Sequence, residues 1–339
     1  MRKLLNTLYV TTPEAYLCKD GLNVVIKVDQ EEIFRIPIVN IEGIVTFGYM
    51  GASPGLMHLC GEYGVSLTFL SPSGKYIGKF QGPIKGNVLL RTKQWDMAAD
   101  ARQALSISRI FIGGKIQNYR NILARFLRDN GNSDPVSAAA EYLKRCKQRV
   151  LNVPDLDQVR GIEGDAASCY FDVLPHLILN QKNDFPFNGR NRRPPKDAVN
   201  AMLSFAYTLI SSDVMAALET IGLDPYIGFL HTLRPGRPSL ALDLMEELRA
   251  YLGDRLVLSL INRRQVTKTD FLYQGESVIM TDNCKKTILT AWQNRKNEII
   301  SHPFLGEKIQ IGLLPYVQAM MLARFIRGDL DNYPVFLIS

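Results

Sequence analysis

The chain of 339 residues carries 40 basic and 33 acidic side chains, a formal charge of +7, and it is 46% hydrophobic and 22% charged. This composition is typical of globular proteins, so disordered, collagen-like and coiled-coil chains are excluded, and the length suggests two domains of roughly 150 residues. No run of about 18 apolar residues predicts a membrane span, and the N-terminus lacks the apolar block of a signal peptide. The 5 cysteines are scattered and form no Cys-x-x-Cys pair, which argues against a disulfide framework and indicates a cytoplasmic protein.

The first 95 residues predict a β-rich domain. Short segments rich in β-branched residues alternate with turns at close spacing, as at 22–28, 32–38 and 43–47. One helix is expected from Ser53 to Tyr63, because Pro54 suits a first helical turn. We expect a compact sheet or sandwich with this helix over one edge and no catalytic residues.

From about Trp95 the pattern becomes helical. Apolar residues recur at helical spacing from 96 to 126, although Gly113-Gly114 weakens the prediction locally. Further helices are expected at 135–150, 156–180, 195–219, 239–253, 283–300 and 308–327. The predicted fold class is therefore α+β, with a small β-rich domain at 1–95 followed by a larger all-α domain at 96–339.

The first candidate for chemistry is Glu163, in the segment Arg160-Gly161-Ile162-Glu163-Gly164. The surrounding apolar spacing predicts a helix, in which each glycine costs about 1 kcal/mol relative to alanine. Two glycines around one glutamate suggest that something large approaches the backbone. The alternative is a helix start whose glycines admit a neighbouring helix.

The second candidate is His231, which ends the segment Gly228-Phe229-Leu230-His231. It precedes a loop that contains Arg234 and Arg237, and loops beside rigid helices often carry function. The alternative is a buried histidine bonded to the backbone.

The third candidate is the acidic cluster of Asp243, Glu246 and Glu247, which lies away from the apolar face of a predicted helix. Like charges at this spacing destabilise a helix by about 0.2–0.5 kcal/mol per pair unless a cation or solvent relieves them. A solvated face is one explanation and a metal ion is the other. With Glu163 and His231, one acid from this segment would complete an oxygen-rich site that suits Mn²⁺ or Mg²⁺ and could polarise a phosphodiester.

A basic stretch lies between the first two candidates. It predicts a phosphate-binding surface, or alternatively a loop that caps the helix starting near Pro195. Its candidate nucleic-acid-binding residues are Arg190, Arg192, Arg193 and Lys196.

These segments, in this order, resemble the CRISPR-associated (Cas) protein one family, the integrase and endonuclease of CRISPR spacer acquisition, and specifically its type I-C branch. The matching stretches are 160–164, 193–207, 228–231 with 239–246, 327–329 and 333–334, and the opening 8–21 is similar to the family's first hairpin. The resemblance implies an N-terminal β-sandwich, which serves dimerisation and partner contacts, and a C-terminal helical catalytic domain. It also implies a homodimer that works with the small CRISPR-associated protein two on double-stranded DNA, both protospacer and CRISPR repeat.

The resemblance also assigns the site. It implies Glu163, His231 and Glu246 as catalytic ligands of Mg²⁺ or Mn²⁺, with Asp243 behind them and Arg234 and Arg237 among the DNA-binding residues. The sequence pattern alone does not separate Asp243 from Glu246 as the third ligand. The expected function is metal-dependent DNA cleavage and insertion of spacers at the repeat; the alternative is a catalytically weak nucleic-acid-binding scaffold of a CRISPR or DNA-repair assembly.

Overall fold

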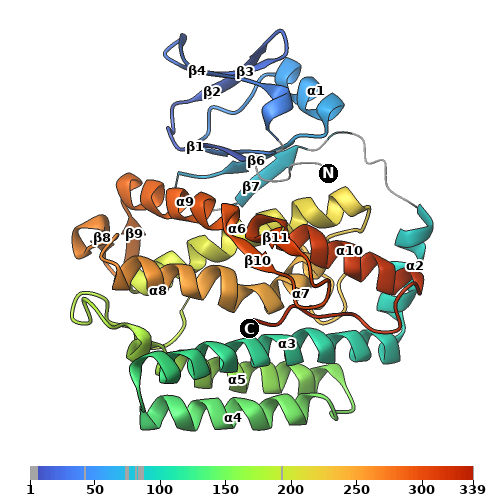
Figure 1. Cartoon of the computed structure of the whole chain (residues 1–339). Coiled ribbons are helices and arrows are strands. Elements are labelled where there is room, and N and C mark those ends of the chain that lie inside the picture. The colour runs from blue at the N-terminus through green and yellow to red at the C-terminus, as the bar shows by residue number, and fades with distance from the viewer. Residues whose placement is uncertain are drawn as a thin grey trace. The chain divides into compact units, whose positions relative to one another are not determined.

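The computed structural model describes residues 7–41, 43–72, 76–80, 82, 88–191 and 194–338. The chain divides into two compact units (Figure 1). The β-rich unit comprises 1–85, 282–298 and 310–313, and the helical unit comprises 86–281, 299–309 and 314–339. The first break between the units lies at 85–86, and two segments distant in sequence, 282–298 and 310–313, join the β-rich unit.

The β-rich unit contains two sheets. One has the strand order β1-β5-β6-β7 and the other the order β2-β3-β4. The strands are β1 (Thr7–Val10), β2 (Tyr16–Asp20), β3 (Asn23–Val28), β4 (Glu31–Pro37), β5 (Gly43–Phe47), β6 (Ser66–Leu70) and β7 (Tyr76–Phe80). Strand β1 pairs in parallel with β5, whereas β2 pairs antiparallel with β3. The expected hairpin over 8–21 is therefore wrong: the turn at Asp20-Gly21 joins β2 to β3 instead.

Helix α1 (Pro54–Tyr63) and the two sheets share one apolar core. The helix begins as expected, because the Ser53 hydroxyl accepts a hydrogen bond from the Leu56 amide and Pro54 occupies the first turn. Leu56 and Leu59 then face buried side chains such as Leu17 and Ile44. The same unit includes the short helix η1 (Ile38–Asn40), helix α9 (Asp282–Asn297) and η4 (Ile311–Leu313).

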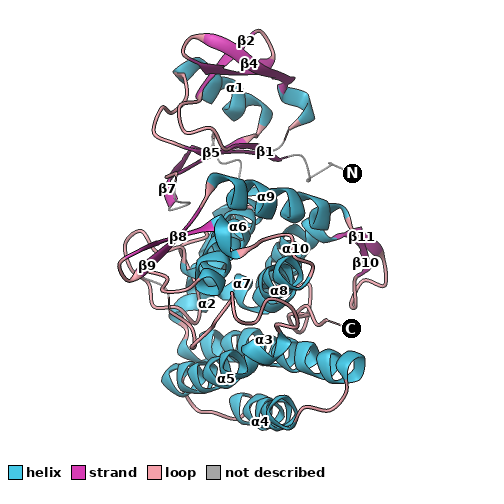
Figure 2. Ribbon diagram, turned by 90° about the vertical axis from the view of Figure 1, so that its left-hand side faces the viewer, coloured by secondary structure: helices cyan, strands magenta, loops and turns pink. Residues whose placement is uncertain are grey.

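The helical unit is built on long helices, of which α3, α4 and α5 pack side by side (Figure 1). Its helices are α2 (Val88–Ala99), α3 (Ala101–Asn130), α4 (Asp134–Val150), α5 (Leu156–Leu177), α6 (Ala198–Ile221), α7 (Ser239–Leu248), η2 (Arg249–Asp254), α8 (Arg255–Asn262), η3 (Lys268–Asp270) and α10 (Leu314–Arg327). Short strands accompany them: β8 (Phe271–Gln274) pairs with β9 (Ser277–Met280), and β10 (Ile299–Ser301) with β11 (Lys308–Gln310) (Figure 2). The expected β-rich region followed by a mostly helical domain is confirmed, but the second domain is not all-α.

The helix expected over 96–126 is interrupted at Asp100. The Asp100 side chain accepts hydrogen bonds from the amides of Arg102 and Gln103, so α2 ends and α3 begins there. The glycine pair does not break α3. A methyl group on Gly114 would stand 2.2 Å from the Val335 side chain, so this glycine admits the C-terminal segment against the helix.

Helix α6 is long and apolar enough to cross a membrane by length and composition, but 67% of its most apolar window is buried inside the protein. It is a core helix of the helical unit. After α7 the chain continues through η2, a turn of π-helix, a form that is rare and frequent at functional sites.

Candidate functional site

Glu163 lies in the first half of α5, with a half-buried side chain. The helix begins at Asp155, whose carboxylate accepts a hydrogen bond from the Gln158 amide. A methyl group built on Gly161 or on Gly164 would meet no atom of the described residues within 4 Å. The two glycines therefore do not admit a neighbouring helix; they leave open space on the surface of α5.

Lys115 of α3 joins the two candidate glutamates. Its ammonium group forms an ion pair with Glu163 and a second one with Glu246 Oε2, at 2.7 Å. The lysine is only 2% exposed, and its Nζ lies 5.6 Å from the centre of the Tyr119 ring. One buried cation thus holds together carboxylates from two different helices, α5 and α7.

Glu246 is held by a second cation from η2. Arg249 Nη2 lies 3.1 Å from Glu246 Oε1, so the two carboxylate oxygens face two different positive groups. Burial alone would raise the pKa of Glu246, but the charges of Arg249, Lys115 and His231 outweigh it and lower the pKa to about 2. Glu246 is therefore a buried carboxylate that stays ionised, close enough to His231 to respond to its charge.

Asp243 holds His231 in place. Its Oδ2 accepts hydrogen bonds from the amides of Phe229 and Leu230 at 2.6 and 3.0 Å, and its Oδ1 accepts one from the His231 amide. The same Oδ1 lies 2.6 Å from His231 Nδ1. With Nδ1 bonded to the carboxylate, the tautomer is fixed and Nε2 is left as the ring nitrogen available to a ligand.

Gly228 makes this arrangement possible. A methyl group at Gly228 would stand 2.7 Å from Asp243 Oδ2 and 2.6 Å from the Ser239 backbone, so only glycine lets the loop pass this close to the start of α7. Arg160 holds the other side of the loop, because its guanidinium donates two hydrogen bonds to the Leu230 carbonyl at 3.1 and 2.7 Å. The first candidate segment thereby positions the second.

The donor set fits a divalent cation. Glu163 and Glu246 offer carboxylate oxygens and His231 offers Nε2, which suits Mg²⁺ or Mn²⁺. Glu246 Oε2 is buried and accepts no well-aligned hydrogen bond, although Lys115 lies 2.7 Å away. Among the residues that the structure describes, no three His, Cys, Asp or Glu side chains form a ready metal-ligand cluster, and Lys115 stands between the two glutamates. Asp243 and Glu246 differ in their partners: both oxygens of Asp243 are bonded to the histidine loop, whereas the oxygens of Glu246 face only the side chains of Lys115 and Arg249.

The basic stretch contains one arginine that bonds within the protein, Arg190, and one lysine that lies at the surface, Lys196. The guanidinium of Arg190 donates to Asn200 Oδ1 at 2.6 Å and Ser204 Oγ at 3.1 Å and lies over the Tyr207 ring, so it secures the start of α6. Lys196 is exposed and pairs with Glu276 at 2.8 Å. The predictions for Arg192 and Arg193 lie outside the described residues.

The loop after His231 carries the other two expected DNA-binding arginines. Arg234 is exposed, and Arg237 is half-buried with its amide bonded to the Arg234 carbonyl. Burial, followed by the charge of Arg234, lowers the pKa of Arg237. The two guanidinium groups therefore gather positive charge on the loop that His231 begins.

Sequence reasoning missed three side chains of this region: Lys115, Arg249 and Glu247 as an anchor. Lys115 was detectable, since it occupies the apolar face of α3 between Ile112 and Tyr119, where a lysine must find buried partners. The sequence did not indicate that Arg249 pairs with Glu246, because this contact depends on the π-helical turn.

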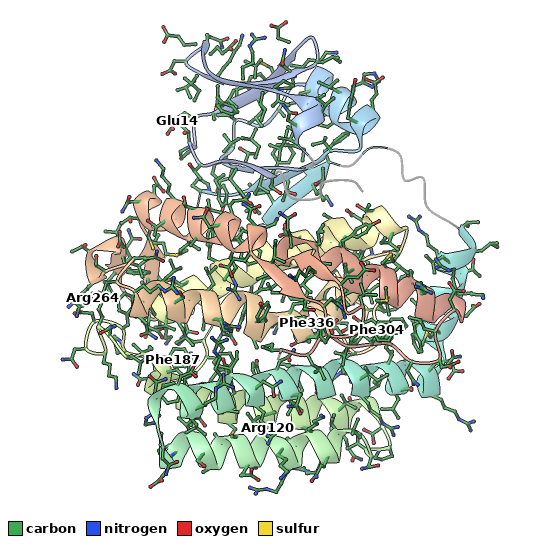
Figure 3. The ribbon with its side chains drawn as sticks, viewed as in Figure 1. Glu14, Arg120, Phe187, Arg264, Phe304 and Phe336 are labelled. Atoms are coloured by element: carbon green, nitrogen blue, oxygen red, sulfur yellow. The ribbon has the colours of Figure 1, made fainter. Side chains whose placement is uncertain are left out.

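Glu247 is fully buried and bonds to the C-terminal segment rather than to the site. It accepts hydrogen bonds from Gln318, from the Tyr333 hydroxyl and from the Phe336 amide, and burial raises its pKa to about 7. Phe336, labelled in Figure 3, packs against the rings of Tyr251 and His302. Glu247 therefore anchors the C-terminal segment against α7 and α10, and the acidic cluster is not a solvated face.

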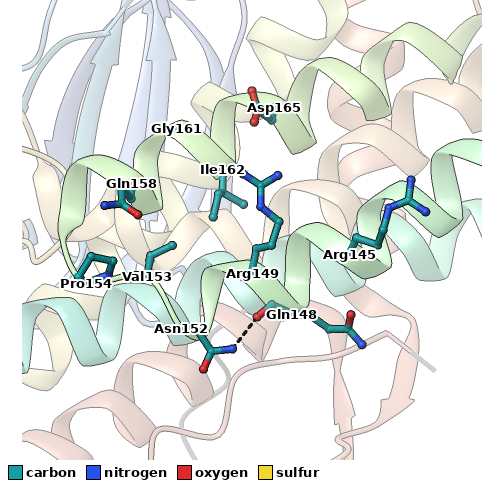
Figure 4. Close-up of a pocket in the computed structure, with 10 residues that line it drawn as sticks. All are labelled: Arg145, Gln148, Arg149, Asn152, Val153, Pro154, Gln158, Gly161, Ile162 and Asp165. Carbon is teal, nitrogen blue, oxygen red and sulfur yellow. Dashed lines mark hydrogen bonds between the residues drawn. The ribbon is translucent and has the colours of Figure 1, made fainter.

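A groove of about 760 Å³ lies between α4 and α5 (Figure 4). Arg145 and Arg149 line it from α4, and Gly161, Ile162 and Asp165 line it from α5. None of Glu163, His231 and Glu246 lines this groove. It is an open groove beside α5 with a mixed polar and apolar lining, separate from the buried charges.

Comparison with known proteins identifies the family. The model of the family "CRISPR associated protein Cas1" matches residues 8–294. The chain is 50% identical to CRISPR-associated endonuclease Cas1 1 of Chlorobaculum tepidum, over 99% of both chains. It is 49% identical to CRISPR-associated endonuclease Cas1 2 of Rhodospirillum rubrum, over 98% of both.

Solved structures share the fold. A Cas1 protein from Thermotoga maritima superposes with a TM-score of 0.83 at 22% identity, over 95% of this chain and 97% of that one. A casposase bound to integration product has a TM-score of 0.84 at 22% identity, over 97% and 93%. With a family model and full-length relatives of this identity, the chain belongs to the Cas1 family of CRISPR-associated endonucleases.

Proposed function

We propose that the chain is a divalent-metal-dependent DNA endonuclease and integrase that inserts short foreign DNA into CRISPR arrays. The observation that carries the proposal is the convergence of two carboxylates, Glu163 and Glu246, on one buried ammonium, with His231 oriented beside them by Asp243. Family membership supports the same activity, since the full-length relatives are named endonucleases.

Glu163, His231 and Glu246 would hold Mg²⁺ or Mn²⁺. A divalent cation held there supplies Lewis-acid polarisation of a phosphodiester. Two of the three residues are already arranged as such ligands: Glu246 is kept ionised by its neighbouring cations, and the bond between Asp243 and His231 Nδ1 leaves Nε2 as the ring nitrogen available to a ligand. Arg160 keeps the histidine loop against α5 through the Leu230 carbonyl.

The reaction is a transesterification. A 3′-hydroxyl of the captured DNA attacks a phosphorus atom of the repeat, loses its proton and forms a new P–O bond. The bond from that phosphorus to the 3′-oxygen of the neighbouring repeat nucleotide breaks, and this leaving oxygen takes up a proton. The chain contributes orientation and charge. Arg234, Arg237 and Lys196 are suited to phosphate contacts, as are Arg192 and Arg193, and the open surface of α5 at Gly161 and Gly164 leaves room for a DNA backbone to approach this helix.

We also infer the assembly. The active form would be a cytoplasmic homodimer, of type I-C character, joined to the small protein Cas2. One solved structure with this fold, at a TM-score of 0.85 and 21% identity, is part of a Cas6-RT-Cas1–Cas2 complex. That complex contains a different protein of the same fold, so the presence of Cas2 in it supports a Cas2 partner for this chain only through the shared family.

Strand transfer tests the proposal. A labelled short duplex, a plasmid that bears a CRISPR repeat, Cas2 and Mn²⁺ or Mg²⁺ should give plasmid-linked label with the wild-type chain. Glu163→Ala and His231→Ala should abolish transfer while keeping a cooperative thermal transition, since each removes a ligand without opening a core cavity. Near-normal transfer by either variant would show that the site is elsewhere. DNA binding without transfer by the wild type would favour the scaffold.

A further inference from the structure

The charges around Glu163 and Glu246 already balance without a metal ion. The two carboxylates face Lys115 and Arg249, each of which pairs with a glutamate oxygen. The remaining acid, Asp243, is met by three backbone amides and by His231 Nδ1. A divalent cation added beside Lys115 therefore meets two carboxylates whose charges Lys115 and Arg249 already offset.

Lys115 is the group that a divalent cation must displace. It is 2% exposed and reaches both proposed carboxylate ligands at once, so its ammonium occupies the space between them. Arg249, by contrast, reaches only Glu246 Oε1. Like charges at such short range repel strongly in a buried site, because little solvent screens them.

We propose that Lys115 couples metal binding to DNA binding at this site. In the absence of DNA its ammonium holds the two carboxylates and weakens their affinity for a divalent cation. A DNA phosphate brings the missing negative charge, pairs with the displaced ammonium, and lets the cation bind. This inference rests on the proposed function, because it assumes that Glu163 and Glu246 are the ligands.

The coupling has a reciprocal form. If DNA tightens metal binding by some factor, the metal ion must tighten DNA binding by the same factor. Removing the lysine charge should therefore do two things that a structural role would not do. It should tighten metal binding to the free protein, and it should shrink the effect of DNA on that binding.

The experiment measures the dissociation constant of Mn²⁺, by electron paramagnetic resonance of the free ion, with and without a short duplex that ends in a 3′-hydroxyl. Wild type should bind Mn²⁺ at least fivefold more tightly with DNA. Lys115→Met should bind it at least fivefold more tightly than wild type without DNA, and DNA should then add less than it does in wild type. Lys115→Arg keeps the charge and should resemble wild type.

Lys147→Met is the matched control. Lys147 of α4 is half-buried and donates a hydrogen bond to Gln117 of α3 at 2.8 Å. It belongs neither to the proposed metal site nor to the proposed DNA-binding residues, so its replacement removes one positive charge without freeing Glu163 or Glu246. Its Mn²⁺ affinity should equal that of wild type. If Lys115→Met does not give a cooperative thermal transition, Lys115→Gln replaces it, because the glutamine amide can still donate to one carboxylate.

Two outcomes would overturn the proposal, and they differ from each other. A gain of less than fivefold for the neutral Lys115 variant, with Mn²⁺ binding still lost in Glu163→Gln, would remove the role of Lys115 and leave the metal site standing. Unchanged Mn²⁺ binding in Glu163→Gln would show that the metal site itself is wrong, and the coupling would fall with it.

Discussion

Glu246 and Asp254 are both fully buried acids of the α7–η2 segment, yet their surroundings act on them in opposite directions. Glu246 lies between Lys115 and Arg249, and its pKa is lowered to about 2. Asp254 accepts a hydrogen bond from the Tyr207 hydroxyl at 2.6 Å, and burial raises its pKa to about 6. Burial is common to both, so the cations make the difference: only the cation-paired acid is kept ionised as a ligand must be.

Glu246 belongs to a charged region with Lys115 and Arg249, whereas Asp254 belongs to a second region, a cluster of tyrosines next to it. Tyr119 stacks on Tyr170 with ring centres 3.9 Å apart, and Tyr207 bonds Asp254. Arg249 connects the regions, because it pairs with Glu246 and lies 5.2 Å from the Tyr207 ring centre. Lys115 lies over the Tyr119 ring and Arg249 over the Tyr207 ring, so the tyrosine cluster is expected to support the two cations without touching substrate.

The largest expected effect comes from Glu246 itself. Glu246→Gln keeps the shape of the side chain but removes its charge, and it should abolish strand transfer at any Mn²⁺ concentration. Asp243→Asn should retain activity about 10–100-fold below wild type and recover in part with excess Mn²⁺, since Asp243 acts through His231. Side-by-side Mn²⁺ titrations of transfer decide this. A dead Asp243→Asn with an active Glu246→Gln would exchange the two roles.

Breaking the link between the two regions should cost stability. Arg249→Met leaves Glu246 Oε1 buried without its cation, so the free energy of unfolding should fall by about 3–5 kcal/mol, measured in urea. The pKa of Glu246 should rise at the same time. The control is Arg125→Met, which breaks an exposed pair with Asp129 and should cost about 0–1 kcal/mol. Equal losses of unfolding free energy in the two variants would show that Arg249 does not stabilise a buried charge.

The tyrosine region should show its own pH dependence. Because the pKa of Asp254 is raised from 3.8 to about 6, the folded state binds its proton more tightly than the unfolded state does. Its contribution to stability is therefore complete below about pH 4 and is lost as the pH rises to 6, by at most about 3 kcal/mol.

Asp254→Asn tests this dependence and should remove that part of the decline, as seen in thermal unfolding measured from pH 4 to 7. Tyr207→Phe sharpens the test. It removes a hydrogen bond that lowers the pKa of Asp254, so the decline should still begin near pH 4 but extend to higher pH than in wild type. Profiles of wild type and Asp254→Asn that stay parallel would show that this carboxyl does not titrate there.

The sequence predicted the site residues that stand in short motifs. Glu163, His231, Asp243 and Glu246 stand in contiguous motifs, and the structure brings them to one region. The partners of the two cations could not be predicted in the same way: the position of Lys115 on an apolar helix face indicates burial but not which carboxylates it meets, and Arg249 acts through a π-helical turn. The same limit applies to the fold: the long helices follow from periodicity, whereas the parallel pairing of β1 with β5 depends on long-range contacts.

The smallest expected effect concerns the two glycines beside Glu163, and it separates stability from function. In a helix interior, Gly164→Ala should stabilise by about 1 kcal/mol, or about 2–4 °C in Tm, because nothing described lies within 4 Å of the added methyl group. If DNA approaches this open face, the same methyl group should reduce strand transfer. Gly113→Ala in α3 is the control: its methyl group would make ordinary contacts at 3.8 Å with Leu151, so it should gain similar stability and keep full activity. A stabilised and fully active Gly164→Ala would mean that DNA does not use this face, and the charged cluster would then be reached from the side of the His231 loop.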